Sequence, residues 1–289
     1  MAGLKEVRER ITSIGSTMQI TSAMKMVSAA KLKKAQDRIT QMRPYSEKLT
    51  EILQNLSGEL EGTDGKYSAE RDVEKVLVVA VASNRGLCGG FNAYVNKKVG
   101  VLINETYAGK EVSVLAIGKK VSDYWTKRGN LASQHNELFD DLTFENVAAV
   151  TETVMDAFAN GDYDHVVLVY NQFKNAATFN TSTEQFLPVV SAATEHGVKT
   201  TSVDYIFEPG KGEILEDLIP LSLKTQIFKA TLDSNAAEHG ARMTAMHKAT
   251  DNASDMLKEL KLTYNKARQA SITNEILEIV GGAAALEDA

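Results

Sequence analysis

Apolar residues near the N-terminus recur with the period of a helix that packs against one other helix. Successive apolar positions are separated by three and four residues in alternation, which is the heptad pattern of a coiled coil. The intervening positions are mostly charged or polar. The pattern predicts a helix whose seam consists of five residues: Leu4, Val7, Ile11, Ile14 and Met18.

The next stretch, residues 18–32, is apolar around most of a helical circumference apart from its lysines. A helix of this kind must be enclosed by protein on more than one side. Helical periodicity resumes afterwards and then meets Pro44. Because proline removes a backbone donor, we expect a kink or short break there, followed by more helix to about Leu56.

A second and longer heptad occupies the C-terminal part of the chain, which has no proline after Pro220. About sixty residues of helix would measure about 90 Å, far more than the width of a compact domain of this size. Such a helix must project from the body or pass through another protein. Its seam is predicted at Met243, Met246, Thr250, Ala253, Leu257, Leu260, Tyr264 and Ala267, before a register jump to Ile272, Ile276 and Ile279.

The middle of the chain has the pattern of an α/β domain. Continuous apolar runs are typical of buried parallel strands, and helical patterns lie between them. The predicted strands cover 76–82, 112–117 and 165–170, the helices 92–106, 118–128 and 144–160, with a less regular β segment at 177–188 and an edge strand from Val203 to Phe207.

The expected fold class is therefore α/β: a long antiparallel coiled coil of N- and C-terminal helices with an inserted Rossmann-like α/β domain. The expected domains are an N-terminal shaft helix at 1–57, a linker at 58–72, the inserted domain at 73–209 and a C-terminal shaft helix at 210–289.

Composition and charge limit the classes of function. The net charge of −6 gives no reason to expect nucleic-acid binding, and Cys88 is the only cysteine, so no intrachain disulfide can form. The first residues lack the features of a signal or transit peptide, and no apolar run is long enough to span a membrane. We expect membrane association only through partners. Six cations and one acid between Lys25 and Arg43 form either a solvated helix face or a surface for an acidic partner.

The loop Ser83–Asn92 is glycine-rich and follows the first strand, where a dinucleotide fold holds a pyrophosphate. Its glycines are spaced G-x-x-G-G instead of G-x-G-x-x-G, so nucleotide binding is the weaker interpretation and close packing the stronger. The five histidines show no metal spacing, and His239 and His247 are expected to be solvated. We expect no catalytic site, cofactor or metal.

Motifs at both ends and in the middle resemble the gamma subunit of F-type ATP synthases. The resemblance covers essentially the whole chain. Its motifs are Ile20–Lys31, Ala241–Met246 with Ala249–Ala253, Tyr264–Ile279, and the central loop Arg85–Gly90 with Asn92.

The resemblance implies a central rotor stalk that couples ion flow through the membrane rotor to ATP synthesis or hydrolysis. Its implied partners are the alpha and beta subunits of the catalytic head, the epsilon subunit and the c-ring. The chemistry would belong to the beta subunits. The implied location is the cytoplasmic face of a bacterial membrane, as a peripheral protein.

The matching motifs also imply roles for individual residues. The implied contacts to the alpha/beta ring are Met24, Lys25, Lys31, Arg268 and Gln269. Coupling or shaft geometry is implied for Arg242, Thr273 and Glu275, and a foot that meets epsilon and the c-ring for Tyr205, Phe207 and Glu208.

Two alternatives remain open at this point. The chain could be a coiled-coil scaffold whose α/β domain docks another assembly. Less favoured is a nucleotide-binding enzyme that uses loop 83–92. ATPase activity of the chain alone, compared with its activity beside alpha and beta subunits, separates these readings.

Overall fold

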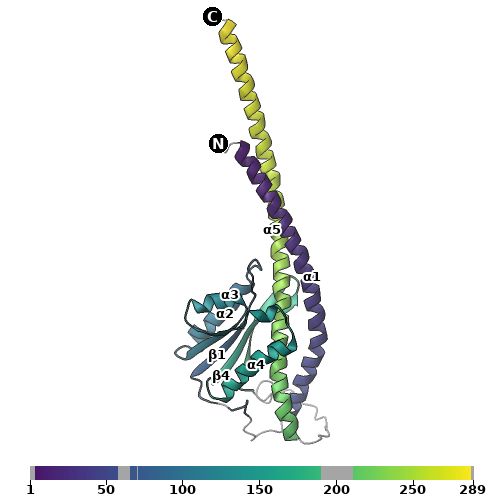
Figure 1. Cartoon of the computed structure of the whole chain (residues 1–289), viewed down its shortest axis with the longest axis vertical. Helices are drawn as coiled ribbons and strands as arrows, with labels where there is room; N and C mark the ends of the chain where they lie inside the picture. The colour runs from purple at the N-terminus through teal and green to yellow at the C-terminus, as the bar shows by residue number, and fades with distance from the viewer. Residues whose placement is uncertain (1–3, 58–65, 70, 190–210, 288–289) are drawn as a thin grey trace. The chain divides into compact units, whose positions relative to one another are not determined.

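The computed structural model describes residues 4–57, 66–69, 71–189 and 211–287. Helix α1 (Leu4–Ser57) and helix α5 (Lys211–Glu287) pack against each other, and all strands come between them in the chain. This arrangement confirms the predicted fold class (Figure 1). The predicted edge strand Val203–Phe207 and the foot residues Tyr205, Phe207 and Glu208 lie outside the described residues.

The chain forms two compact units. The coiled-coil unit contains Met1–Val27 and Met243–Ala289, and the sheet unit contains Ser28–Arg242. Each unit therefore holds parts of both α1 and α5. The domain boundaries expected from the sequence follow the ends of helices, and they remain a prediction.

In the coiled-coil unit, every position of the two predicted heptads is buried or half-buried. The most enclosed are Val7, Met246 and Ala253, whose exposed fractions are below 10%. The hydroxyls of Thr21 and Thr250 lie 2.9 Å apart and join the two helices across the seam. The heptad prediction is thus confirmed. The apolar positions after the register jump, including Ile272 and Ile276, are exposed within this chain.

The sheet unit contains a five-stranded sheet in the order β3-β2-β1-β4-β5. Strands β1 to β4 are parallel, and β5 pairs antiparallel with β4. The strands are β1 (Lys75–Val81), β2 (Glu111–Ile117), β3 (Leu131–Gln134), β4 (His165–Asn175) and β5 (Thr178–Leu187).

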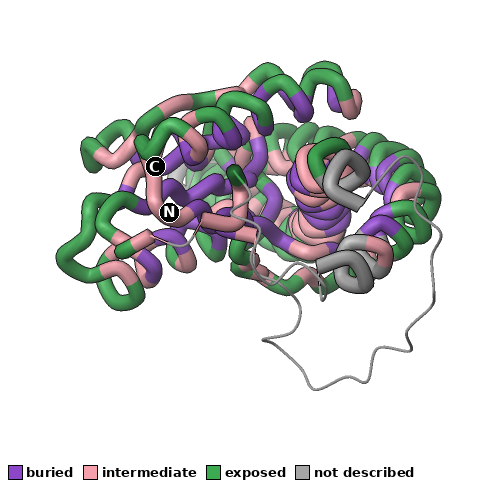
Figure 2. Tube along the Cα trace, turned by 90° about the horizontal axis from the view of Figure 1, so that it is seen from below, coloured by how far each residue is buried: buried purple, intermediate pink, exposed green. Residues whose placement is uncertain are grey.

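Helices cover both faces of this sheet, so β1, its central strand, is buried along its whole length after Lys75 (Figures 1 and 2). Alternate residues of β1, such as Val76 and Val78, pack with α2 (Phe91–Val101) and α3 (Lys119–Thr126) in one core cluster. A π-helical turn, Leu102–Thr106, extends α2. On the other face, α4 (Phe144–Ala159) lies beside the first part of α5, where the rings of Phe144 and Phe228 meet edge to face.

Two sequence-based expectations need correction. The sequence missed β3, whose four residues alternate in burial but are too few to show a period. Of the expected kink or short break at Pro44, the break is wrong, because α1 continues through it to Ser57, and the helix expected up to about Leu56 is present. An interior proline costs about 3 kcal/mol in a helix. Burial of Ile39 and Leu49 on either side, each less than 10% exposed, offsets that cost.

Gly240 lies in the interior of α5 where a side chain would collide with the β4–β5 turn. A Cβ at this position would lie 2.8 Å from the carbonyl oxygen of Ala176. Helix propensity alone favours alanine over glycine by about 1 kcal/mol. We nevertheless expect Gly240→Ala to lower the free energy of unfolding by about 1 to 2 kcal/mol, because backbone must move. Denaturant unfolding checks this sign.

Gly15→Ala is the matched control, since nothing lies within 4 Å of a Cβ built there. This second substitution should raise stability by up to about 1 kcal/mol. Stabilisation by both substitutions would show that the turn at Ala176 yields freely.

Candidate functional site

The loop after β1 is a tight turn at the carboxyl edge of the sheet. Leu87 and Gly89 both have left-handed backbone angles, with φ of 64° and 60°. The Ser83 backbone N–H donates to Asn92 Oδ1 at 3.0 Å, and Asn92 Nδ2 donates to Cys88 Sγ at 3.2 Å. The first turn of α2 therefore fixes both ends of the loop.

Arg242 of α5 binds the outer side of this loop. Its Nη1 donates to the carbonyl oxygen of Gly86, and its Nη2 lies 3.2 Å from the carbonyl oxygen of Arg85. The same Nη2 pairs with Glu238 Oε1 at 2.5 Å, one helical turn earlier. Both side chains are about 90% buried. We call these groups, Arg242, Glu238 and the carbonyls of Arg85 and Gly86, the arginine clamp.

Burial governs the electrostatics of the arginine clamp. It raises the pKa of Glu238, while the hydrogen bond and charge of Arg242 and the charge of Lys31 oppose that rise. Burial also lowers the pKa of the neighbouring His239 to about 4, helped by the charges of Lys31 and Arg242. The Nδ1 atom of His239 is buried and has no hydrogen-bond partner among the described residues.

Cys88 has the environment of a structural thiol. It is 2% exposed, and burial raises its pKa. The thiolate is the nucleophilic form of cysteine, so this environment disfavours reactivity. Its sulfur instead accepts the amide of Asn92, and this gives the residue a role in holding the loop.

The same edge of the sheet is cross-linked by a second asparagine. Asn84 Nδ2 donates to the carbonyl oxygen of Asn136 at 2.7 Å, and the backbone N–H of Lys119 donates to Asn84 Oδ1 at 2.9 Å. The carboxyl edge is where α/β folds bind ligands. In this chain, Arg242 and the two hydrogen bonds of Asn84 occupy that edge of the sheet. The geometry therefore favours a loop 83–92 that attaches the sheet to α5 over a loop that binds a pyrophosphate.

The coiled-coil unit contains two further groups of predicted site residues. Lys25 Nζ lies 3.4 Å from His247 Nδ1, so the first residue of the basic run contacts α5. Farther along α5, Arg268 and Glu275 line one cavity of about 360 Å³. Leu4, Lys5, Arg8, Tyr264, Ser271 and Ile272 complete its walls, and Arg8 Nη2 donates to the Tyr264 hydroxyl at 2.7 Å.

The structure places the predicted residues in several different surroundings. Met24 and Lys25 are half-buried, whereas Lys31, Gln269 and Thr273 are exposed. Thr273 donates its hydroxyl to the carbonyl oxygen of Gln269 at 2.9 Å. Glu275 Oε1 accepts the Ser271 hydroxyl at 3.3 Å. Their roles in contact and coupling stay predictions.

Sequence reasoning missed the buried polar groups of α5. His239, expected to be solvated, is mostly enclosed, and Asp233 has a side chain only 2% exposed. Two features of the sequence could have indicated these groups. Acids occur within a run of small apolar residues, and Glu238 and Arg242 are four residues apart, as in an intrahelical ion pair. Which acids are buried depends on how the sheet packs, and that is not visible in a helical period.

The fold defines a class of protein in which two long terminal helices pack together and an α/β domain is inserted between them in the chain. A sequence model of ATP synthase matches residues 3–286. The ATP synthase gamma chains of Flavobacterium johnsoniae and Flavobacterium psychrophilum are 63% and 61% identical to this chain, covering 99% of it and at least 99% of each relative. The chain belongs to the ATP synthase gamma chain family.

A solved structure has the same fold. It is a chain from the Euglena gracilis mitochondrial ATP synthase, solved as an assembly of OSCP, F1 and c-ring, with a TM-score of 0.71 at 22% identity. The match covers 98% of this chain and 94% of that one.

Proposed function

We propose that this chain is the central rotor stalk of an F-type ATP synthase, coupling ion flow through the membrane rotor to ATP synthesis or hydrolysis by rotation. The observation that carries the proposal is the family match, which runs through both helices and the inserted domain. Its partners are the alpha and beta subunits, the epsilon subunit and the c-ring. The chain has no catalytic site of its own.

Exposed apolar residues on the helices support a surrounding ring of subunits. On α1, the exposed fractions of Ile20, Met26 and Val27 are 58%, 64% and 58%. An apolar surface of this kind is normally covered by a partner. Near the end of α5 the same feature recurs at Ile276, Leu277, Ile279 and Val280.

The composition of this last segment fits rotation inside a sleeve. A turning shaft needs contacts of nearly equal energy at every angle, and apolar contacts are non-directional. Long charged side chains would form hydrogen bonds that favour particular angles. Residues 276–285 are mainly apolar or small, with Glu278 as the one charged side chain.

Residue roles follow from the same proposal. The ring contacts are Met24, Lys25, Lys31, Arg268 and Gln269; the coupling residues are Arg242, Thr273 and Glu275; and the foot consists of Tyr205, Phe207 and Glu208. Among the described residues, no helix is long and apolar enough to cross a bilayer. The chain meets the membrane through its partners, on the cytoplasmic face in a bacterium.

ATPase activity tests the proposal directly. The purified chain alone should hydrolyse no ATP, and adding it to alpha and beta subunits should produce an active, rotating complex. Robust hydrolysis by the chain alone would favour a nucleotide-binding enzyme. Failure to assemble with the two subunits would favour a scaffold for some other complex.

Replacing Arg268 and Gln269 together with alanine tests the ring contact. Both residues are exposed in this chain, so the double substitution should leave its thermal unfolding nearly unchanged. Head assembly or proton-driven synthesis should fall because the directional contacts to the ring are lost. Unchanged synthesis in membrane vesicles would refute the assignment of these two residues.

A further inference from the structure

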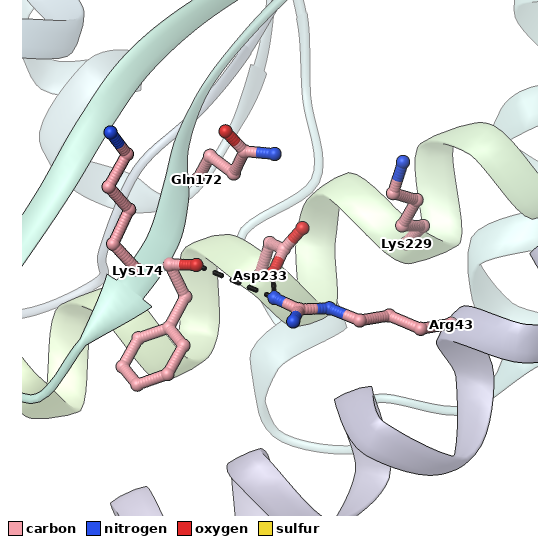
Figure 3. A pocket seen from close by; sticks show the side chains of 6 residues that line it. Arg43, Gln172, Lys174, Lys229 and Asp233 are labelled. Atoms are coloured by element: carbon pink, nitrogen blue, oxygen red, sulfur yellow. Dashed lines mark hydrogen bonds and ion pairs between the residues drawn. The ribbon is translucent and has the colours of Figure 1, made fainter.

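Arg43 of α1 lies at a junction of three elements in the sheet unit. Its Nη2 is 3.7 Å from Asp233 Oδ1 on α5 and 3.5 Å from the carbonyl oxygen of Phe173 on β4 (Figure 3). Gln172, Lys174 and Lys229 complete the walls of a cavity of about 440 Å³ around this junction. One side chain of α1 thus contacts both α5 and the inserted sheet.

Burial of the Asp233 carboxylate at this place costs free energy of folding. Its side chain is 2% exposed, and Oδ1 has no hydrogen-bond partner among the described residues, only the ion pair with Arg43. Burial raises its pKa, with Arg43 and Lys229 opposing and Glu184 adding to the rise. Arg43 is 47% exposed, and an ion pair with one buried partner is weak grounds for stability, since burial of the carboxylate costs free energy that the pairing must first offset. The pair is better understood as a device that fixes geometry.

A second arginine of α1 makes the same kind of contact. Arg38 Nη1 donates to the carbonyl oxygen of Leu142, in the segment before α4, at 3.3 Å. Helix α5 is attached independently, by Lys224 to Glu152 on α4 at 2.5 Å and by the arginine clamp. Each long helix therefore has its own polar attachments to the inserted domain.

Polar attachments do what apolar packing cannot. The hydrophobic effect resists separation of two helices but is non-directional, so it opposes sliding and twisting only weakly. Hydrogen bonds from a guanidinium group are directional and favour one register. Suppose that the inserted domain is turned and the two long helices are held together only by apolar contacts. The helices would then twist relative to each other before the torque reached their far ends.

We propose that Arg43 and Arg38 are positioning residues for energy coupling, which hold α1 to the inserted domain so that torque enters both long helices together. This inference rests on the proposed rotor function. It assigns to the basic run between Lys25 and Arg43 a second role, because the guanidinium groups of its last two cations contact backbone carbonyls of the inserted domain. Asp233 acts through Arg43 and keeps its guanidinium in place.

The test uses the complete ATP synthase carrying variant chains, with a bead attached to the inserted domain and the rotor stalled. In the variant that combines Arg43→Gln with Arg38→Gln, the torsional stiffness between the inserted domain and the long helices should fall roughly by half. The angular fluctuations of the bead should then widen by about 1.4-fold, because their amplitude varies inversely with the square root of the stiffness. Proton pumping per ATP should fall under load, while hydrolysis without load stays near wild type. Lys33→Gln is the matched control, because Lys33 pairs with Asp37, one turn along the same exposed stretch of α1.

Two milder variants keep the test decisive if the double variant does not assemble. Asp233→Asn removes the ion pair but relieves a buried charge, and Arg43→Lys keeps the charge but loses the planar guanidinium group. Both should widen the fluctuations less than the double variant. Wild-type fluctuations in these variants, in a complex that rotates, would overturn the inference. A wild-type complex that does not rotate would instead refute the rotor function itself.

Discussion

Replacing Arg242 with methionine is expected to lower the free energy of unfolding of the sheet unit by about 3 to 5 kcal/mol, the cost of leaving a buried charge without its partner. The substitution keeps the length of the side chain and removes its charge. Glu238 would remain about 90% buried with no guanidinium beside it. The carbonyl oxygens of Arg85 and Gly86 would lose their donor at the same time. Denaturant unfolding of the purified chain measures the change.

A second variant separates the buried charge from the lost packing. In Arg242→Met combined with Glu238→Gln, no unpaired carboxylate remains, so most of the lost stability should return. If the double variant is as unstable as the single one, the contacts to the loop carbonyls carry the energy instead of the ion pair.

The chain supplies a matched control for this experiment. Glu6 and Arg10 form an ion pair with the same four-residue spacing at 2.8 Å, but their side chains are 49% and 63% exposed. Arg10→Met should therefore cost no more than about 0.5 kcal/mol. A similar loss at both arginines would mean that burial does not set the strength of the clamp.

The sequence predicted those parts of the fold that depend on local periodicity. The heptads of α1 and α5 were visible because a seam repeats every 3.5 residues over many turns. The strands β1, β2 and β4 were visible because a strand buried on both faces is continuously apolar. By contrast, β3 is too short to show a period, and Pro44 was overruled by tertiary packing around Ile39 and Leu49.

The candidate site was predictable only in part, for a different physical reason. Motif resemblance selected Arg242, but no local rule could show that it reaches the carbonyls of Arg85 and Gly86, more than 150 residues away. The contacts of Arg38 and Arg43 to backbone carbonyls were hidden for the same reason. A basic run looks identical whether its arginines face solvent, a partner, or backbone carbonyls of the same chain.

The buried imidazole of His239 should make the stability of the sheet unit depend on pH. Burial and the charges of Lys31 and Arg242 lower the pKa of His239 to about 4 in the folded chain, against about 6.5 when unfolded. Between these values the unfolded chain binds more protons, so stability falls as the pH drops from 6.5 to 4. The full loss is about 3 kcal/mol, and about 2 kcal/mol of it falls between pH 7 and pH 5.

His239→Gln removes the titrating group and should flatten this part of the profile. Other groups, including Glu238, titrate in both proteins, so the difference between the two unfolding curves isolates the histidine. His247→Gln serves as the control for the substitution itself, since the side chain of His247 is 56% exposed. Urea unfolding at half-unit pH steps from 7 to 4.5 provides the curves. Parallel curves for wild type and His239→Gln would show that the imidazole is protonated in the folded chain at little cost, and that solvent reaches it beside Lys31 and Arg242.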